Sequence, residues 1–188
     1  SIVLIGGWLG VGPYAASDTH ILQVTWKDGL PQFAWLQPAV HGTPPGPCNM
    51  HSADYVDLHK SVYVFRGGNG EEYLNDLHAF DLDDWTWRVV DTVGARPQPR
   101  ANHASAYADG QLVIFGGWNG TTRLNDVAIL DVTTHTWTQP WVGGVLPQPR
   151  AGMTLVAVQD YWILWGGSGT SSKCFGDLHL LDRHEMVW

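Results

Sequence analysis

Four pairs of adjacent glycines recur along the chain, each at the end of a short apolar run. They are Gly6-Gly7, Gly67-Gly68, Gly116-Gly117 and Gly166-Gly167, spaced 61, 49 and 50 residues apart. Self-similarity at a period of about 50 residues is typical of arrays of small units that bury their apolar faces by stacking on one another. The sequence therefore predicts one repeated unit, with boundaries at approximately 1–47 (partial), 48–99, 100–149 and 150–188 (partial).

An aspartate and a tryptophan recur at fixed places after each glycine pair. The aspartates are Asp18, Asp76, Asp126 and Asp177. Trp87, Trp137 and Trp188 each follow the last three aspartates by 11 residues. The first unit departs from this spacing, because Asp18 is followed by both Trp26 and Trp35, with a turn-like Lys27-Asp28-Gly29 between them.

A proline-rich segment precedes the later units. Pro-Gln-Pro-Arg ends at Arg100 and again at Arg150, each 16 residues before the next glycine pair. The earlier equivalent, Pro45 to Cys48, lacks the arginine.

The pieces of each unit are predicted to be short β-strands. Runs such as Val62–Phe65 are apolar, bounded by glycine and too short for helices, which favours strands buried on both faces. The double glycine permits a positive φ and a tight change of direction. Asp126–Val132 fits a second strand, the tryptophan segment a third, and Ala104–Tyr107 the strand that opens a unit. Each unit therefore supplies four strands.

Four strands per unit and no helical pattern indicate an all-β fold, a β-propeller of four-stranded antiparallel sheets. The apolar run with its double glycine, the aspartate, the tryptophan and the Pro-x-Pro-Arg segment together resemble the kelch-repeat family, over essentially the whole chain. The large tryptophans are then expected to be wedges between neighbouring blades.

The number of units predicts an incomplete arc of a larger propeller, with about four blades present. Propellers usually close with 4 to 8 blades, and the sequence opens inside one blade and stops before the last strand of another. We expect uncovered strand edges and one uncovered sheet face at each end. Closure of four blades by strand exchange is the alternative.

Charge and composition narrow the class of partner. The net charge is -8, with 10 basic and 18 acidic residues, so no diffuse electrostatic footprint for nucleic acid is expected. No apolar run approaches the ~18 residues of a membrane-spanning helix, so no membrane insertion is expected. Cys48 and Cys174 are too few for a disulfide framework, which favours a reducing compartment. We expect a cytoplasmic location, cytoskeletal or ciliary if the protein is part of a large complex.

Metal sites and cofactors are not expected. His20, His78 and His179 each lie two residues after a repeat aspartate, and no H-x-x-x-H or C-x-x-C spacing suggests zinc. These histidines are expected to pack or hydrogen-bond within the repeat. The family that this chain resembles also includes metal-dependent enzymes. The iron-site pattern of the plant specifier proteins, Glu-x-x-x-Asp-x-x-x-His, does not start at Glu71, Glu72 or Glu185. The chain is therefore expected to be non-enzymatic, and a metal-dependent kelch enzyme is a weaker alternative.

The repeated residues are expected to be structural, and the residues that differ between units to carry binding. The structural set is Gly6, Gly7, Gly67, Gly68, Gly116, Gly117, Gly166, Gly167, Asp76, Asp126, Asp177, Trp87, Trp137 and Trp188. The variable loops are residues 8–17, 69–74, 118–124 and 168–175, together with the Pro-Gln-Pro-Arg segments.

From these loops come seven candidate partner-binding residues, because arginine and exposed aromatics are enriched at binding hot spots. They are Arg100, Arg150, Arg123, Lys173, Trp8, Trp118 and Tyr73. Arg100 and Arg150 recur, so a blade-stabilising ion pair is an equally weighted interpretation.

The predicted function is a protein-protein interaction module. In one version the loops at the channel mouth capture a peptide or degron, as in the ubiquitin-ligase adaptors that carry kelch domains. That version, a substrate-recognition subunit of a ubiquitin ligase, predicts a basic and aromatic mouth containing arginines. In the other, the propeller is a scaffold in a large assembly and binds through its rim.

Overall fold

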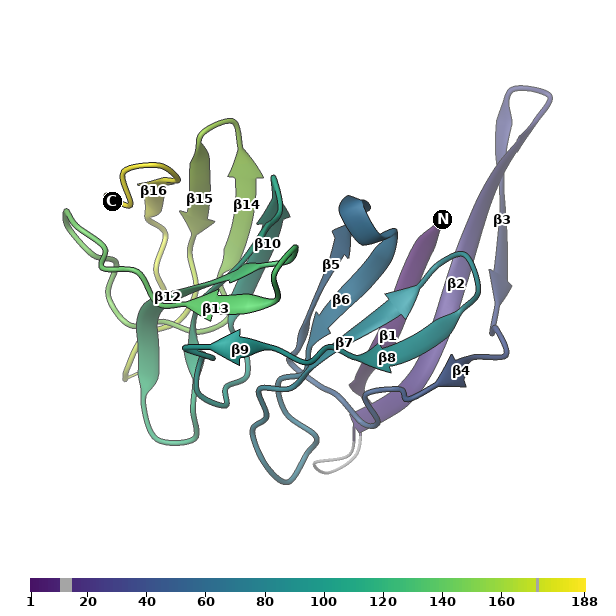
Figure 1. The fold of residues 1–188 in the computed structure, drawn as a ribbon, viewed down its shortest axis with the longest axis horizontal. Helices are drawn as coiled ribbons and strands as arrows, with labels where there is room; N and C mark the ends of the chain where they lie inside the picture. The colour runs from purple at the N-terminus through teal and green to yellow at the C-terminus, as the bar shows by residue number, and fades with distance from the viewer. Residues whose placement is uncertain (11–14, 172) are drawn as a thin grey trace.

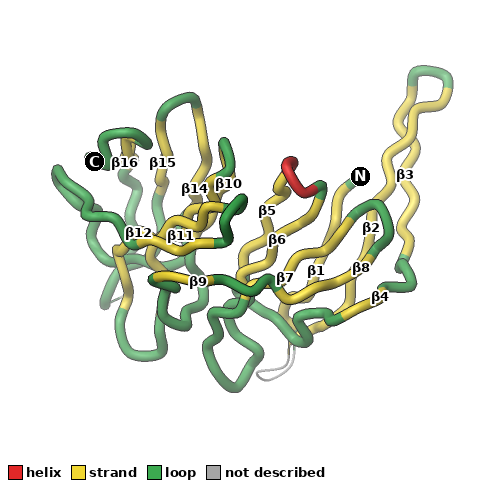
Figure 2. Tube along the Cα trace, viewed as in Figure 1, coloured by secondary structure: helices red, strands yellow, loops and turns green. Residues whose placement is uncertain are grey.

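The structure, a computed structural model, describes residues 1–10, 15–171 and 173–188. Strands and loops make up nearly all of it, and one single-turn 3-10 helix, η1 (Asp57–His59), is the helical element of the described residues (Figure 2). The chain is therefore all-β, as predicted.

Four sheets follow one another along the chain (Figure 1). The first has the order β1 (Ile2–Trp8), β2 (Ala15–Lys27), β3 (Leu30–Leu36). The second has the order β4 (His41–Gly42), β8 (Thr86–Val89), β7 (Leu77–Asp81), β6 (Ser61–Phe65), β5 (Ser52–Val56). The third has the order β10 (Ala104–Ala108), β11 (Gln111–Trp118), β12 (Arg123–Asp131), β13 (Thr136–Thr138), β9 (Val93–Gly94). The fourth has the order β14 (Thr154–Val158), β15 (Tyr161–Trp165), β16 (Leu178–Asp182).

Each sheet is one blade of a β-propeller, which confirms the predicted fold. The first and fourth sheets lie at opposite ends of the molecule (Figure 1), and no hydrogen bond or ion pair joins them within the described ranges. The four blades therefore form an open arc.

A fifth, parallel strand on the outer edge of the second and third sheets was not predicted. β4 and β9 each come from the segment that precedes the blade, and they pair in parallel with β8 and β13. Gly143 makes the same parallel bridge to Val187 in the fourth blade. The sheets thus take in residues a few positions before the predicted unit boundaries at 48 and 100, and those boundaries stay a prediction.

A glycine is required in each of these outer segments. Gly42, Gly94 and Gly144 lie three residues before Pro45, Pro97 and Pro147 respectively, and all have φ between 76° and 84°. A Cβ there would lie 2.0 to 2.3 Å from the carbonyl oxygen of Trp87, Trp137 and Trp188 respectively. The recurring Gly-x-x-Pro-x-Pro in the sequence was the signal for this element.

The blade interfaces are closed by aromatic side chains. Trp137 of the third blade packs edge-on against Phe65 of the second, with ring centroids 6.0 Å apart, and Trp188 packs in the same way against Phe115, at 5.5 Å. Trp87 is fully buried in a cluster that includes Ile5 of the first blade. The tryptophans therefore lie between neighbouring blades.

The inner strands are joined by a hydrogen-bond chain from blade to blade. The Asn102 amide donates to the Met50 carbonyl (2.9 Å), and the Gly152 amide donates to the Asn102 carbonyl (2.8 Å). All three residues have a positive φ, between 52° and 69°. These hydrogen bonds fix the spacing of successive blades at the start of β5, β10 and β14.

The strand register corrects the position of one predicted glycine pair. Phe65 pairs with Leu77 as Phe115 pairs with Val127, so Arg66 and Gly67, and not Gly67 and Gly68, occupy the double-glycine place in the second blade. Arg66 does not have the positive φ of Gly116. Gly68 corresponds instead to Trp118, since both form a bridge to the segment that opens a blade.

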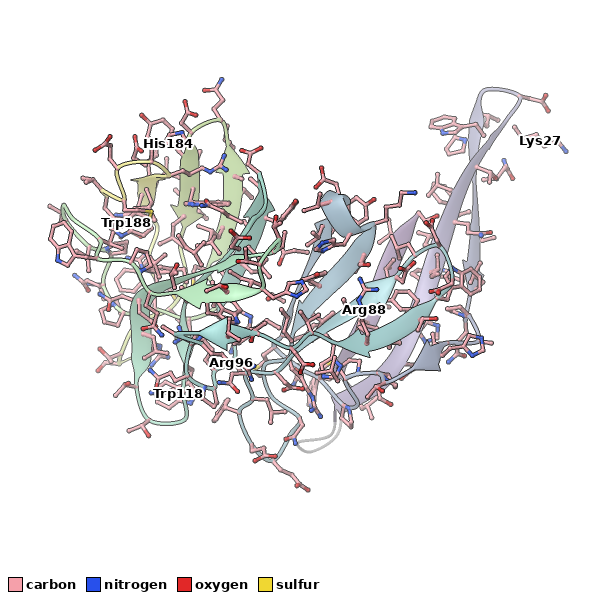
Figure 3. The ribbon with its side chains drawn as sticks, in the orientation of Figure 1. Lys27, Arg88, Arg96, Trp118, His184 and Trp188 are labelled. Carbon is pink, nitrogen blue, oxygen red and sulfur yellow. The ribbon has the colours of Figure 1, made fainter. Side chains whose placement is uncertain are left out.

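The sheet at the N-terminal end of the arc has an uncovered apolar face. β2 and β3 form a long hairpin that projects beyond the other sheets, with Lys27 at its tip (Figure 3). Cross-strand pairing places Ile2 beside Leu22 and Trp35, and Val24 beside Phe33, so these side chains share one face. Trp26, Phe33 and Trp35 are 60 to 72% exposed there.

Candidate protein-binding face

Arg100 and Arg150, both predicted to contact a partner, are fully buried. Arg100 donates from Nη1 and Nη2 to the two carboxylate oxygens of Asp126, each at 2.7 Å, and from Nη1 to the Gly116 carbonyl. Arg150 makes the same fork to Asp177 and donates to the Gly166 carbonyl. Their guanidinium groups are not presented to a partner, so the binding prediction is wrong for them and the ion-pair interpretation holds.

The second blade obtains the same ion pair from another position. Cys48 occupies the place of Arg100 and is buried, and Arg66 reaches across to Asp76 (3.2 Å) and the Pro47 carbonyl (3.4 Å). Arg100 makes an equivalent bond to the Gln98 carbonyl. The sequence did carry a signal for this exchange. The second unit has no arginine before its first strand, but it has one, Arg66, directly before its glycine pair.

Asp76 and Asp177, two of the repeat aspartates, have lowered pKa values. Hydrogen bonds from Arg150 hold the pKa of Asp177 well below its usual range. Burial raises the pKa of Asp76, but hydrogen bonds from His78 and the charge of Arg66 more than offset this, so its pKa is also lowered. The ring nitrogens of His20, His78 and His179 lie 2.8 to 3.0 Å from the aspartate two residues earlier. These histidines are thus hydrogen-bonded within the repeat.

Two titratable groups, buried His103 just before β10 and partly buried Asp54 on β5, lie between the second and third blades. Burial, together with the charge of Arg100, lowers the pKa of His103 to about 3. His103 Nε2 lies 2.8 Å from the Ser52 hydroxyl of the neighbouring blade. Burial raises the pKa of Asp54 to about 6, and its carboxylate accepts a hydrogen bond from Ser105. Both groups bridge the second and third blades.

We call the end of the arc that carries the β6–β7, β11–β12 and β15–β16 connections the loop face. The segments that precede β5, β10 and β14 reach the same end, because they bridge to Gly68, Trp118 and Ser168. In Figure 3, Trp118 lies at this end, opposite His184 and the Lys27 hairpin tip.

A cavity of about 490 Å³ opens on the loop face where three blades meet. Trp8 at the end of β1, Asn49 and Met50 before β5, residues 70–73 of the β6–β7 loop and Ala101 before β10 line it. The structure thus brings together Trp8 and Tyr73, two of the predicted residues, which are 61% and 37% exposed. Part of the predicted loop at residues 8–17, namely residues 11–14, lies outside the described residues.

The cavity lining also contains residues that were not singled out from the sequence. Glu71, Glu72 and Met50 line it, and Met50 is 49% exposed. The two glutamates lie in the variable loop 69–74, but arginine and aromatic side chains are the types enriched at binding hot spots, so only Tyr73 was predicted there.

The other predicted residues form two separate sites on the third and fourth blades. The Arg123 guanidinium lies over the Trp118 ring, 5.5 Å from its centroid. Lys173 Nζ lies 5.0 Å from the Phe175 ring centroid and 3.3 Å from the Gln148 side-chain oxygen. The guanidinium of Arg150 also lies over the Phe175 ring, 4.0 Å from its centroid. Neither Trp118 nor Lys173 lines the cavity.

Within the described ranges, no group of three or more His, Cys, Asp or Glu side chains is arranged to hold a metal ion. Across the same residues, no helix is long and apolar enough to span a membrane.

The repeated sheets and their buried tryptophans define a protein of the β-propeller class. The KLHDC2/KLHL20/DRC7 Kelch-repeats domain matches residues 1–188. The chain belongs to the kelch-repeat family.

Curated relatives come from different kinds of protein. Acyl-CoA-binding domain-containing protein 5 of Arabidopsis thaliana is 37% identical over 96% of this chain and 20% of its own length. Rab9 effector protein with kelch motifs of Mus musculus is 36% identical over 57% of the chain and 28% of its own length. Dynein regulatory complex subunit 7 of Chlamydomonas reinhardtii is 31% identical over 45% of the chain and 7% of its own length. The chain thus spans about a fifth of the length of the plant relative.

Proposed function

We propose that this kelch propeller is a non-enzymatic protein-protein interaction module that binds a protein partner through its loop face. One observation carries the proposal: exposed Trp8, Met50 and Tyr73 gather around a single cavity, on a frame whose repeated arginines, Arg100 and Arg150, are buried. Rigid aromatic side chains around a concave site supply the central contacts of many protein interfaces. Relatives named as an effector protein and as a complex subunit support a role in binding proteins.

The kind of protein that the module binds, and what happens to it, stays a hypothesis. A substrate-recognition subunit of a ubiquitin ligase is one special case, in which the bound protein is then degraded. That case predicts arginines at the channel mouth, and Arg100 and Arg150 are buried. A longer cellular half-life of the bound partner when the loop face is altered would support that case.

A scaffold role in a large assembly, with binding through the rim of the propeller, is supported by the relative that is named as a complex subunit. The dynein regulatory complex subunit among the relatives makes a cytoskeletal or ciliary location the corresponding proposal, with a cytoplasmic one for the module in general.

The test of the loop face compares two matched aromatic substitutions in the full-length protein. Trp8→Ser with Tyr73→Ser removes two cavity walls, and Tyr161→Ser removes a tyrosine of similar exposure, 39%, at the β14–β15 turn on the opposite end. Affinity purification from the native cells, with quantitative mass spectrometry, should show a specific partner lost with the first variant only. Equal recovery of every partner with both variants would show that the loop face is not the binding surface.

A further inference from the structure

The cavity on the loop face carries charge of one sign. Glu71 and Glu72 both line it, and among the described residues no lysine, arginine or histidine does. Both glutamates are exposed, and neither takes part in any ion pair between the described residues. The nearest arginine in sequence, Arg66, is already paired with Asp76. The negative charge at this cavity is therefore not neutralised by the chain around it.

The remaining walls are aromatic and apolar. Trp8 and Tyr73 expose their rings, Met50 adds a flexible thioether, and Gly68, Gly70 and Ala101 leave the space open. Aromatic faces attract cations that lie over them, and apolar walls accommodate the aliphatic stem of a long basic side chain. The volume, about 490 Å³, lies within the range of sites that enclose a small group or a few side chains.

We propose that this cavity binds an arginine side chain from a basic segment of a protein partner. The inference rests on the proposed function of the loop face and names the chemistry that the face recognises. Arginine fits better than lysine, because its planar guanidinium stacks on aromatic rings and donates a fork of hydrogen bonds to carboxylates. The overall net charge of -8 also favours the approach of a basic segment.

The loop that carries the glutamates holds its shape without them. The Asn69 side-chain oxygen accepts hydrogen bonds from the amides of Glu71 and Glu72, each at 2.8 Å. The β11–β12 loop makes the same turn, since Asn119 accepts from the amides of Thr121 and Thr122 at 2.9 and 2.8 Å. Because threonines occupy these places in a loop of the same length, Glu71→Thr with Glu72→Thr is expected to keep the fold and remove only the charge.

The ring of Tyr73 is also fixed in position. A Cβ at Gly120 would lie 3.0 Å from the Tyr73 ring, so the tyrosine packs against the β11–β12 loop of the next blade. Tyr73 therefore forms a rigid wall opposite the end of β1, and a bound guanidinium would not have to order it.

The test uses fluorescence anisotropy with the full-length protein and a labelled Gly-Ser-Arg-Arg-Gly-Ser peptide. Its counterpart has citrulline in place of both arginines, which keeps the shape and removes the charge. We expect the arginine peptide to bind about tenfold more tightly or better, and Glu71→Thr with Glu72→Thr to remove that advantage. Asp91→Thr with Glu185→Thr removes the same charge outside the cavity lining and should leave the advantage in place. Equal binding of the two peptides, or no binding of either, would overturn the inference.

A second measurement separates this inference from the proposed function. In the affinity purification described above, Trp8→Ser with Tyr73→Ser and Glu71→Thr with Glu72→Thr are compared side by side. Loss of the partner with both pairs supports both proposals. Loss with the aromatic pair alone means that the loop face binds a partner that is not basic, so only the arginine inference fails. Retention of the partner with both pairs contradicts both.

Discussion

The second and third blades have the same frame but obtain their central ion pair from different positions. In the third blade Arg100 comes from the segment before the inner strand, is fully buried and forms a two-pronged bond with Asp126. In the second blade Arg66 comes from the double-glycine position, keeps 19% of its side chain exposed and makes one bond to Asp76. The repeat thus preserves a contact between arginine and aspartate, and not the position from which the arginine comes.

The loops of the same two blades show the opposite pattern. Residues 69–76 and 119–126 have the same length and share Asn-Gly at the start and Leu-Asn-Asp at the end. Between them, Glu71, Glu72 and Tyr73 replace Thr121, Thr122 and Arg123. The frame of the loop is identical while its charge is reversed, which separates what folds a blade from what a blade presents.

The largest effect is expected from removing the buried arginine. Arg100→Ala leaves the Asp126 carboxylate without its cation and the Gly116 carbonyl without one donor, and should lower the free energy of unfolding by about 3 kcal/mol. Arg66→Ala should cost only about 1 kcal/mol, because its pair is single and partly exposed. Urea unfolding followed by tryptophan fluorescence measures both, and hydrogen exchange localises the loss to one blade. Equal costs would mean that the two arrangements are energetically equivalent.

Each of the two blades has an outer parallel strand. Replacing one glycine in that strand is expected to have the next-largest effect on stability. Gly94→Ala places a Cβ 2.3 Å from the Trp137 carbonyl oxygen, and a non-glycine residue at φ +84° is also strained. We expect a loss of about 2 kcal/mol in the free energy of unfolding. Gly110→Ala is the control, because φ is +78° but no atom lies within 4 Å of the added Cβ. Its cost should be about 1 kcal/mol. A cost equal to that of Gly94→Ala would show that the close approach of the outer strand to the Trp137 carbonyl does not contribute to the loss.

The burial of His103 should make stability depend on pH. Its pKa is about 3 in the native state, against 6.5 in its ordinary state, so the unfolded chain binds more protons between these values. The free energy of unfolding therefore falls as pH falls below 6.5, by about 1 kcal/mol between pH 7 and 5.5 for this group alone. Met153 stands at the equivalent place in the fourth blade, which makes His103→Met the matched variant. Unfolding curves at the two pH values should differ less for His103→Met, and an unchanged difference would exclude His103 as the cause.

Much of the frame could be predicted from the sequence, because it recurs. The double glycines, the aspartates and the tryptophans give the strand order and the blade count, since each blade needs the same turn and the same wedge. The parallel outer strand was missed because His41–Gly42 and Val93–Gly94 are only two residues each, too short to show a period. The spacing of Gly42, Gly94 and Gly144 from the prolines held the information, but it describes a backbone contact and not an apolar pattern.

The candidate site was only partly predictable, since it depends on which loops meet in space. Trp8 and Tyr73 are 65 residues apart, and nothing in the sequence shows that they line the same cavity. For Arg100 the sequence supported partner binding and a blade-stabilising ion pair with equal weight, and only the fold shows that Asp126, 26 residues later, is the partner of its buried guanidinium. The glutamates were overlooked because the expected mouth was basic.

The smallest effect is expected when one blade is rebuilt to match the other. Arg66→Gly restores a true double glycine in the second blade, and Cys48→Arg places an arginine where Arg100 stands in the third. Each change alone should destabilise the protein, the first by removing the cation of Asp76 and the second by directing two guanidinium groups to one carboxylate. Together they should leave one arginine for one aspartate, within about 0.5 kcal/mol of the original free energy of unfolding.

Backbone hydrogen bonds at the joints between neighbouring blades give the physical reason for that recovery. Gly7 donates to the Cys48 carbonyl and Gly117 to the Arg150 carbonyl, whereas no such bond from Gly67 to Arg100 is formed among the described residues. Glycine at position 66 would free the backbone to make it, as at the other two joints. A double-mutant cycle by urea unfolding measures the coupling between positions 48 and 66. Additive losses would show that the arginine cannot be moved back, and that the second blade depends on Arg66 for more than its charge.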